Sequence, residues 1–168
     1  MSQLNICNYG NTLLEDCMKN RHYFDLVVFN INSIIHDISN HVNIDLENYK
    51  FMIIPKTNKK GFSMKWHIDD VAMIKTNKDA ISDNCGIIIG DKQKYRLYHK
   101  LDLPIYSAII YLSEYNVDFT GGEFEFLNQK IEPKKNHVLF FDSREVHRVN
   151  IVKSGIRENI LIKFYKIN

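Results

Sequence analysis

"KWHIDD", residues 65–70, places a histidine and two aspartates in a run that otherwise has the pattern of a β-strand. On a strand, residues i and i+2 point to the same face. His67 and Asp69 are therefore predicted to lie side by side, whereas Asp70 points to the opposite face. A same-face imidazole and carboxylate supply two of the three ligands of a 2-His-1-carboxylate metal site. We therefore expect a second histidine to come from a distant part of the chain.

His147 is the best candidate for the third ligand. It follows the apolar run "NHVLFFD" (136–142) and opens another strand-like run, "HRVNIV" (147–152). The remaining histidines are poorer candidates, because they fall in a predicted helix, beside an irregular segment or at the start of a strand: His22, His36, His41, His99 and His137. Either His67 or His147 alone would be read as a structural residue, so the prediction depends on the set as a whole.

Arg157 adds a binding group of a different kind. It lies ten residues after His147, beyond the "KSG" at 153–155. We interpret "VKSGIR" (152–157) as the tight turn of a hairpin between the last two strands, which would bring Arg157 back alongside His147. A guanidinium there can bind a carboxylate through two parallel hydrogen bonds. The sequence therefore predicts a carboxylate-binding group near the metal ligands.

The pattern of the chain changes near residue 49. From there on, short runs rich in β-branched and aromatic residues are separated by Gly, Pro, Asn and Asp, which favours an antiparallel sandwich or barrel. Residues 12–42 instead have apolar side chains near helical spacing, so the expected fold class is mainly β with N-terminal helices (α+β). Residues 71–102 are irregular and are predicted to be a surface loop or lid. Gly121 and Gly122 are read as turn or bulge residues, because no helix follows them.

Length and composition bound the remaining possibilities. The 168 residues, 45% of them hydrophobic, predict a single domain over 1–168, with 1–48 as a helical N-terminal support and 49–168 as the core. A net charge of +2 does not favour nucleic acid or a membrane as partner. We see neither a signal peptide nor an apolar run of membrane-spanning length. The three cysteines show no paired spacing, so a soluble, intracellular (cytoplasmic) protein is expected.

Four segments, in order along the chain, resemble the Fe(II)- and 2-oxoglutarate-dependent dioxygenases, in particular the prolyl 4-hydroxylase-like branch. They are "HID" (67–69), "YSAIIYLSEYNVDFTGGEFEF" (106–126), "IEPKKNHVLFFDSREVHRV" (131–149) and "SGIREN" (154–159). The resemblance covers roughly residues 50–168. A lone HxD carries little information, whereas the ordered set is specific. The resemblance implies a double-stranded β-helix, which is a cupin-like jelly roll of two packed sheets.

The resemblance also implies a catalytic metal centre. Fe(II) would be held by His67, Asp69 and His147, and 2-oxoglutarate would chelate the metal. O2 would be the second cosubstrate, succinate and CO2 the products, and ascorbate a supporting reductant.

Three further residues match the cosubstrate-binding positions of the family. Arg157 matches the basic residue that binds the distal carboxylate of 2-oxoglutarate, and Tyr111 matches a tyrosine whose hydroxyl donates to that carboxylate. Asn159 stands where many relatives carry Ser or Thr. An amide can still donate a hydrogen bond there, so Asn159 is included among the predicted cosubstrate contacts.

The function expected from the resemblance is hydroxylation of a protein side chain, prolyl or lysyl, so that the partner is a protein or peptide. An oxygenase for nucleic-acid bases is less favoured, because such enzymes usually carry a second arginine where this chain has Lys163. A small-molecule oxygenase is a further alternative. A non-oxygenase metal-binding cupin would account for His67 and His147 but not for Arg157. The prime substrate and the oligomeric state stay open.

Overall fold

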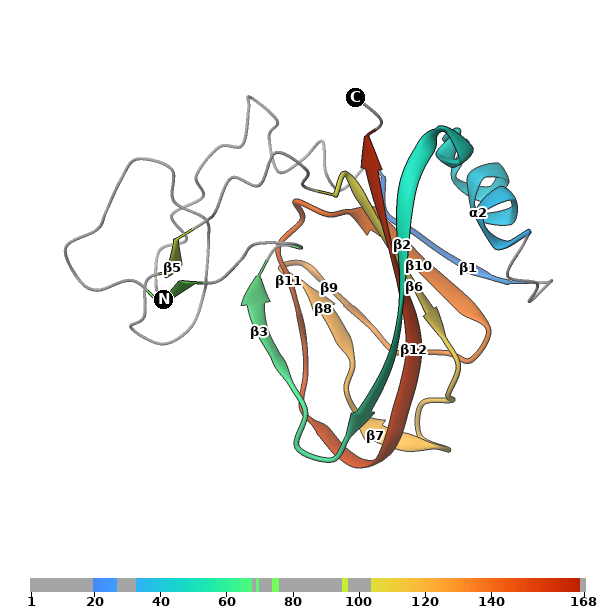
Figure 1. The fold of residues 1–168 in the computed structure, drawn as a ribbon. Helices are drawn as coiled ribbons and strands as arrows, with labels where there is room; N and C mark the ends of the chain where they lie inside the picture. Colours follow the sequence, from blue (N-terminus) through green and yellow to red (C-terminus); the bar gives the residue numbers. More distant parts are fainter. Residues whose placement is uncertain are drawn as a thin grey trace.

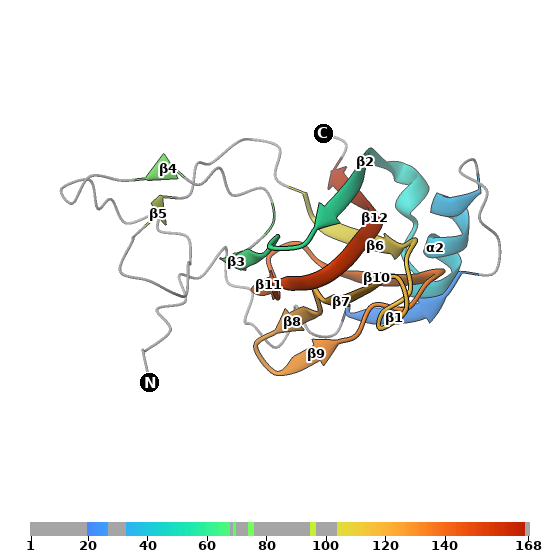
Figure 2. The same ribbon diagram turned by 90° about the horizontal axis from the view of Figure 1, so that it is seen from below.

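The computed structural model describes residues 20–26, 33–67, 69, 74–75, 95–96 and 104–166. Most of these residues form two antiparallel sheets that face each other (Figures 1 and 2). The predicted mainly-β fold is confirmed, and the architecture is that of a double-stranded β-helix.

The larger sheet has the strand order β1-β10-β6-β12-β2, and β7 pairs with β12 beside this path. Its strands are β1 (His22–Asp25), β2 (Tyr49–Lys59), β6 (Tyr106–Tyr111), β7 (Phe119–Gly121), β10 (His137–Asp142) and β12 (Val152–Lys166). The smaller sheet has the order β3-β11-β8-β9, made of β3 (Met64–His67), β8 (Phe124–Phe126), β9 (Gln129–Ile131) and β11 (His147–Val149). The described helices are α2 (Ile34–Val42) and the 3-10 turn η1 (Leu46–Asn48).

Strands β6 and β10 are almost continuously apolar because both of their faces are covered. Ala108 and Phe140 belong to the core shared with α2, whereas Ile109 and Phe141 belong to the core between the two sheets. Side chains alternate between the faces of a strand, so a strand covered on both sides favours apolar residues at most positions. These two strands therefore form the buried surface on which the smaller sheet packs.

The N-terminal part is only partly helical. Ile34, Ile35 and Ile38 are buried on one side of α2, in agreement with the helical spacing in the sequence. Residues 22–25, in contrast, form β1, and the predicted helix is wrong there. These residues pair with the edge of β10, where main-chain hydrogen bonds and alternating burial favour a strand. The rest of 12–32 lies largely outside the described residues.

The predicted hairpin over "VKSGIR" is also wrong. Strand β11 pairs with β3 and β8, whereas β12 pairs with β2, β6 and β7, so the chain crosses from the smaller sheet to the larger one. Gly155, with φ +72°, allows β12 to pass close to β7, since a Cβ there would lie 2.0 Å from the carbonyl oxygen of Asp118. Residues 147 and 157 therefore lie on different sheets and do not lie alongside each other.

Residues 71–102 lie outside the described part of the chain, apart from a short antiparallel pair between β4 (Ile74–Lys75) and β5 (Tyr95–Arg96). Their assignment as a surface loop or lid, like the single-domain boundary of 1–168, stays a prediction. Within the described residues, no helix has both the length and the apolar character needed to cross a membrane.

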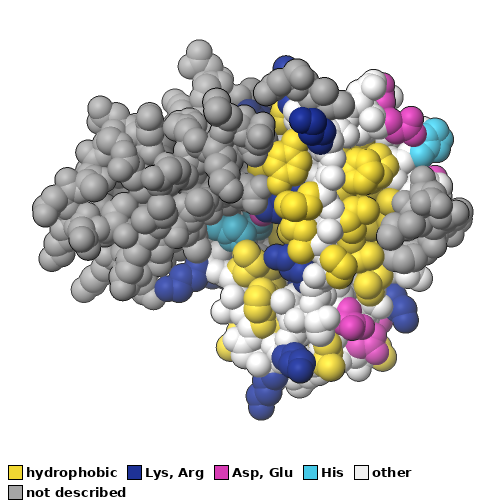
Figure 3. Space-filling model, viewed as in Figure 1, with side chains coloured by type: hydrophobic (Ala, Val, Ile, Leu, Met, Phe, Trp, Pro, Cys, Tyr) yellow, Lys and Arg dark blue, Asp and Glu magenta, His cyan; other side chains and the backbone are white. Residues whose placement is uncertain are grey.

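Strand β2 ends the larger sheet at an edge. Figure 3 shows hydrophobic side chains gathered along this side of the molecule, and the Phe51 and Met52 side chains of β2 are 48% and 42% exposed. One face of the larger sheet points toward the smaller sheet, and the pocket described next lies between the two sheets.

Candidate active site

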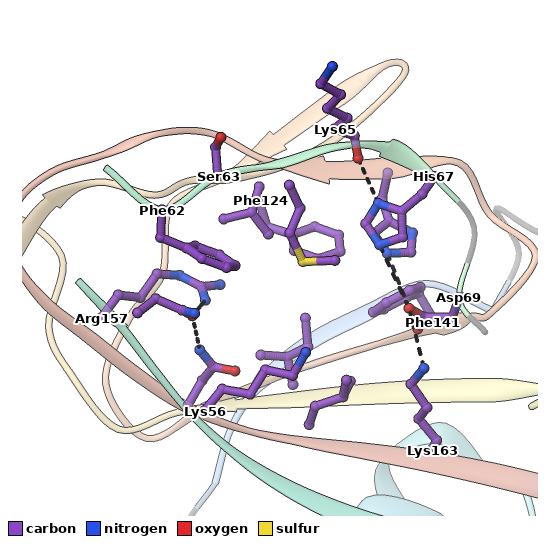
Figure 4. A pocket seen from close by; sticks show the side chains of 17 residues that line it. Lys56, Phe62, Ser63, Lys65, His67, Asp69, Phe124, Phe141, Arg157 and Lys163 are labelled. Atoms are coloured by element: carbon purple, nitrogen blue, oxygen red, sulfur yellow. Dashed lines mark hydrogen bonds and ion pairs between the residues drawn. The ribbon is translucent and has the colours of Figure 1, made fainter. Parts of the chain in front are cut away.

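A pocket of about 530 Å³ opens between the two sheets. Figure 4 shows Arg157 at one end and His67 with Asp69 at the other, with Lys163 approaching Asp69 from β12. We call the group His67, Asp69 and His147 the metal end, and the group Arg157, Tyr111 and Asn58 the arginine end. Apolar side chains form much of the wall between them: Phe62, Met64, Ile109, Phe124, Phe141, Val149 and Leu161.

The two histidines of the metal end face each other across a strand pair. His67 of β3 is the register partner of His147 of β11, and their ring centroids are 4.3 Å apart. Each Nδ1 lies 2.7 Å from the carbonyl oxygen two residues earlier, at Lys65 and Glu145. A carbonyl only accepts hydrogen bonds, so each Nδ1 carries a proton, and in the neutral form of each ring the lone pair lies on Nε2. Both rings are thereby fixed in a metal-ligating tautomer.

Asp69 reaches this pair from beyond the end of β3. Its Oδ1 lies 3.9 Å from Nε2 of His67 and 3.6 Å from Nε2 of His147. The Asp69 N–H donates to the carbonyl oxygen of Ser143 at 2.9 Å, and its Oδ2 accepts a hydrogen bond from the Ser107 hydroxyl. The anchoring of Asp69 therefore comes from a turn contact and a serine, which strand alternation alone does not predict. Asp70 lies outside the described residues.

Burial and neighbouring charges set the protonation of this end. Burial, followed by the proximity of His147, lowers the pKa of His67 to about 4. Burial alone would raise the pKa of Asp69, but His147, Lys163 and the Ser107 hydroxyl together hold it well below its ordinary value. Metal ligation needs neutral imidazole and ionised carboxylate, and these are the forms of His67 and Asp69 near neutral pH. One ligand atom from each of the three residues lies within 4.8 Å of the others.

Lys163 is a part of the site that the sequence analysis noted only as a departure from another pattern. Its Nζ lies 3.9 Å from Oδ1 of Asp69, and its side chain is 9% exposed. Arg157, Asn159 and Leu161 line the same pocket, at alternate positions of β12. Strand alternation counted from Arg157 would therefore have predicted that Lys163 faces the pocket.

The arginine end holds buried donors that lack partners. Arg157 is 2% exposed, and its Nη1 donates to Oδ1 of Asn58 at 3.1 Å. Its Nε and Nη2, together with the Tyr111 hydroxyl, are the buried side-chain polar atoms without a hydrogen-bond partner within the described part of the chain. Burial raises the pKa of Tyr111 to about 12, although Arg157 acts against this, and burial lowers the pKa of Arg157. Buried donors left unpaired are costly, and a carboxylate is the kind of acceptor that such donors bind.

Asn58 orients this arginine and was missed by the sequence analysis. It is the register partner of Arg157 on β2, and its Oδ1 also accepts a hydrogen bond from Nδ2 of Asn159 at 3.3 Å. Asn159 lines the pocket, but its contact with a cosubstrate stays a prediction. Gly122, with φ +67°, leaves room for the arginine, because a Cβ there would lie 3.0 Å from Cδ of Arg157. The reading of Gly121 and Gly122 as turn or bulge residues agrees with their positive φ angles.

Comparison with known proteins bears directly on this two-ended pocket. Residues 50–166 match the 2OG-Fe(II) oxygenase superfamily. The chain is 40% identical over 65 residues to the 2-oxoglutarate and iron-dependent oxygenase domain-containing protein 3 of Xenopus tropicalis. The matched segment covers 35% of this chain and 20% of that protein. The chain thus spans about a fifth of the length of the curated relatives it matches.

Solved structures show a similar fold. A truncated viral collagen prolyl hydroxylase from Paramecium Bursaria Chlorella virus-1 superimposes with a TM-score of 0.56 at 18% identity, covering 90% of this chain and 76% of that one. A Pseudomonas putida prolyl-4-hydroxylase gives a TM-score of 0.53 at 16% identity, with coverage of 86% and 72%. At this level of identity the likeness concerns the fold.

Proposed function

Because this chain belongs to the 2OG-Fe(II) oxygenase superfamily, we propose that it is an Fe(II)- and 2-oxoglutarate-dependent dioxygenase that hydroxylates a prolyl or lysyl side chain of a protein. The observation that carries the proposal is the two-ended pocket. Three side chains that can ligate a metal converge at one end. Arg157 lines the other end and lies beside the buried Tyr111, and both have donors without a hydrogen-bond partner among the described residues.

The metal end has the donor set that Fe(II) requires. His67, Asp69 and His147 would hold the ion through two imidazole nitrogens and one carboxylate oxygen, which is the facial set of non-haem iron oxygenases. Bound iron supplies the oxidation chemistry of the family, which couples the conversion of 2-oxoglutarate and O2 into succinate and CO2 to substrate hydroxylation. The carbonyl acceptors of the two histidines keep both rings oriented for this task.

The arginine end has the donors that a carboxylate requires. Nε and Nη2 of Arg157 and the Tyr111 hydroxyl would receive the distal carboxylate of 2-oxoglutarate, while Asn58 holds Nη1 in place. We include Asn159 in this set because it supports Asn58 and lines the same pocket. Lys163 adds a positive charge at the metal end, where the opposite end of the dicarboxylate would lie.

The aromatic wall protects the reacting groups from water. The Phe124 ring stacks on His147 with centroids 4.9 Å apart, and Phe141 meets the same imidazole edge-on at 4.9 Å. Removing water from such a site strengthens its electrostatic interactions and suppresses side reactions.

A protein substrate is the finer part of the proposal. Its support is the likeness of the fold to proteins named prolyl hydroxylases. We propose in addition that residues 1–168 act as one domain, with 71–102 as an insertion in the jelly-roll core.

The test is succinate formation by the purified chain with Fe(II), 2-oxoglutarate and ascorbate under air, with and without proline- and lysine-containing peptides. We expect turnover that requires His147 and rises with a peptide of one class. Anaerobic calorimetry with Mn(II) and 2-oxoglutarate provides the independent check. Absence of cosubstrate binding there would overturn the oxygenase assignment, whereas binding with no peptide stimulation would overturn the protein-substrate part alone.

A further inference from the structure

Arg21, which lies before β1 and outside the segment matching the family, contacts the turns that hold the metal end. Its guanidinium pairs with the Glu145 carboxylate through both Nη2 and Nε. Its Nη1 donates to the side-chain oxygens of Asn128 at 3.2 Å and Gln129 at 2.6 Å. One arginine thus joins the N-terminal segment to two turns that are distant in the sequence.

Glu145 connects this arginine to a metal ligand. Its side chain points to Arg21 and is 3% exposed, whereas its main-chain oxygen accepts the Nδ1–H of His147 at 2.7 Å. The acceptor that orients the imidazole therefore belongs to the residue that Arg21 fixes. Val146, the only residue between Glu145 and His147 in the sequence, is itself buried, so the segment has little freedom to move independently.

The same arginine also contacts the wall behind His147. Its guanidinium carbon lies 3.8 Å from the centre of the Phe126 ring, and the Phe126 and His147 ring centroids are 6.3 Å apart. Phe126 is the register partner of His147 on the neighbouring strand β8. The Arg21 side chain is 11% exposed, so its ion pair and its cation–π contact are largely shielded from water.

We propose that Arg21 is a positioning residue for the metal centre, which holds His147 in its ligating orientation through Glu145 and Phe126. The inference rests on the proposed metal site. A lysine could not replace this arginine fully, because the contacts use three nitrogens of a planar guanidinium as well as its face.

The test compares Arg21→Gln with a matched control, Arg148→Gln. Arg148 also pairs with a glutamate, Glu125, and also lies over an aromatic ring, Trp66 at 4.6 Å, but these contacts lie outside the path from Arg21 to His147. For each full-length variant, the dissociation constants of Mn(II) and of 2-oxoglutarate at saturating Mn(II) are measured anaerobically. The Co(II) absorption bands report the ligand geometry.

For Arg21→Gln we expect the Mn(II) dissociation constant to rise about 10-fold, the lower end of the range for changes outside the ligands themselves, because the Glu145 carbonyl still accepts from His147 but is no longer held in place by Arg21. The Co(II) bands should shift, and the dissociation constant of 2-oxoglutarate should stay within about twofold of wild type, because the arginine end is unchanged. Arg148→Gln should leave all three measurements near wild type.

Mn(II) binding by Arg21→Gln within twofold of wild type, or an equal loss in Arg148→Gln, would overturn the proposal. If Arg21→Gln does not fold, Glu145→Gln weakens the same contact without leaving an unpaired buried carboxylate, and its Mn(II) affinity decides in the same way. Wild-type protein that does not bind Mn(II) would overturn the proposed metal site together with this inference.

Discussion

The metal end and the arginine end of the pocket differ in how their polar atoms are satisfied. At the metal end, both Nδ1 atoms meet carbonyl oxygens, and Asp69 meets Ser107 and the main chain of Ser143. At the arginine end, the Tyr111 hydroxyl and two nitrogens of Arg157 have no partner among the described residues. The protein thus fixes His67, Asp69 and His147 by its own contacts, whereas the arginine end has buried donors that the described residues do not satisfy.

The supporting elements differ in the same way. The metal end is assembled from the ends of the short strands β3 and β11 and from a turn, so it depends on several tertiary contacts. The arginine end lies on β12 and its two neighbours β2 and β6, and β12 pairs with β2 over Tyr49–Lys59 in a continuous ladder. We therefore expect substitutions at the metal end to lower the stability of the protein without ligand. Substitutions at the arginine end should weaken ligand binding with little change in stability.

The largest effect is expected for His147→Ala. Loss of one of three ligands should abolish detectable Fe(II)-dependent turnover and weaken Mn(II) binding by at least about 100-fold. Anaerobic calorimetry with Mn(II) measures this, with the exposed His36, paired with Glu47 on the surface, replaced by Ala as the control. Equal Mn(II) affinity of the His147→Ala and His36→Ala variants would show that His147 is not a metal ligand.

At the arginine end, Arg157→Met should separate cosubstrate binding from metal binding. Two charge-assisted hydrogen bonds are lost, so the dissociation constant of 2-oxoglutarate should rise about 100-fold, while that of Mn(II) stays within about twofold. The free energy of unfolding without ligand should change by less than about 1 kcal/mol or increase, because the substitution removes a buried charge, two of whose nitrogens have no partner within the described part of the chain. Denaturant unfolding provides the measurement, and a marked loss of Mn(II) affinity would contradict the separation of the two ends.

The pH dependence of the metal-free protein should reveal the metal end. The pKa of His67 is about 4 when folded and 6.5 ordinarily, so the unfolded chain binds the extra proton more readily. The stability that depends on neutral His67 is fully present above pH 6.5 and is lost as the pH falls toward 4. At pH 5 the expected loss in the free energy of unfolding is about 2 kcal/mol. Unfolding of wild type and His67→Gln at pH 7 and pH 5 measures it. A decrease of the same size in both proteins would assign the effect to other groups.

The smallest effects are expected from removing one hydroxyl at each end. Tyr111→Phe should weaken 2-oxoglutarate binding about 10-fold without lowering the melting temperature, because this hydroxyl has no hydrogen-bond partner among the described residues. Ser107→Ala should instead cost about 1 kcal/mol of stability and weaken metal binding, since Asp69 and Ser143 lose a partner. Melting curves and ligand titrations of both variants make the comparison. Equal destabilisation by Tyr111→Phe and Ser107→Ala would contradict the proposed difference, namely that among the described residues the Ser107 hydroxyl has hydrogen-bond partners and the Tyr111 hydroxyl has none.

Much of the fold follows from local patterns, and the exceptions have clear physical causes. The apolar runs of β6 and β10 and the helical spacing of α2 predict their elements correctly. The helix predicted over 22–25 failed because the edge of β10 supplies main-chain partners for a strand there. The hairpin predicted at 152–157 failed because the flanking segments pair within different sheets, and local sequence carries no information about which strand a segment will join.

The sequence by itself determined the residues that line up along one strand face or match an ordered motif: His67, Asp69, His147, Arg157 and Tyr111. Only the tertiary structure decided how these side chains are held. Asn58 accepts a hydrogen bond from Arg157, which is 99 positions away in the sequence, and Arg21 pairs with Glu145, which is 124 positions away. Strand alternation specifies the direction of a side chain but not the partner it meets, because the partner depends on sheet order and register, and these are set by the packing of the whole core.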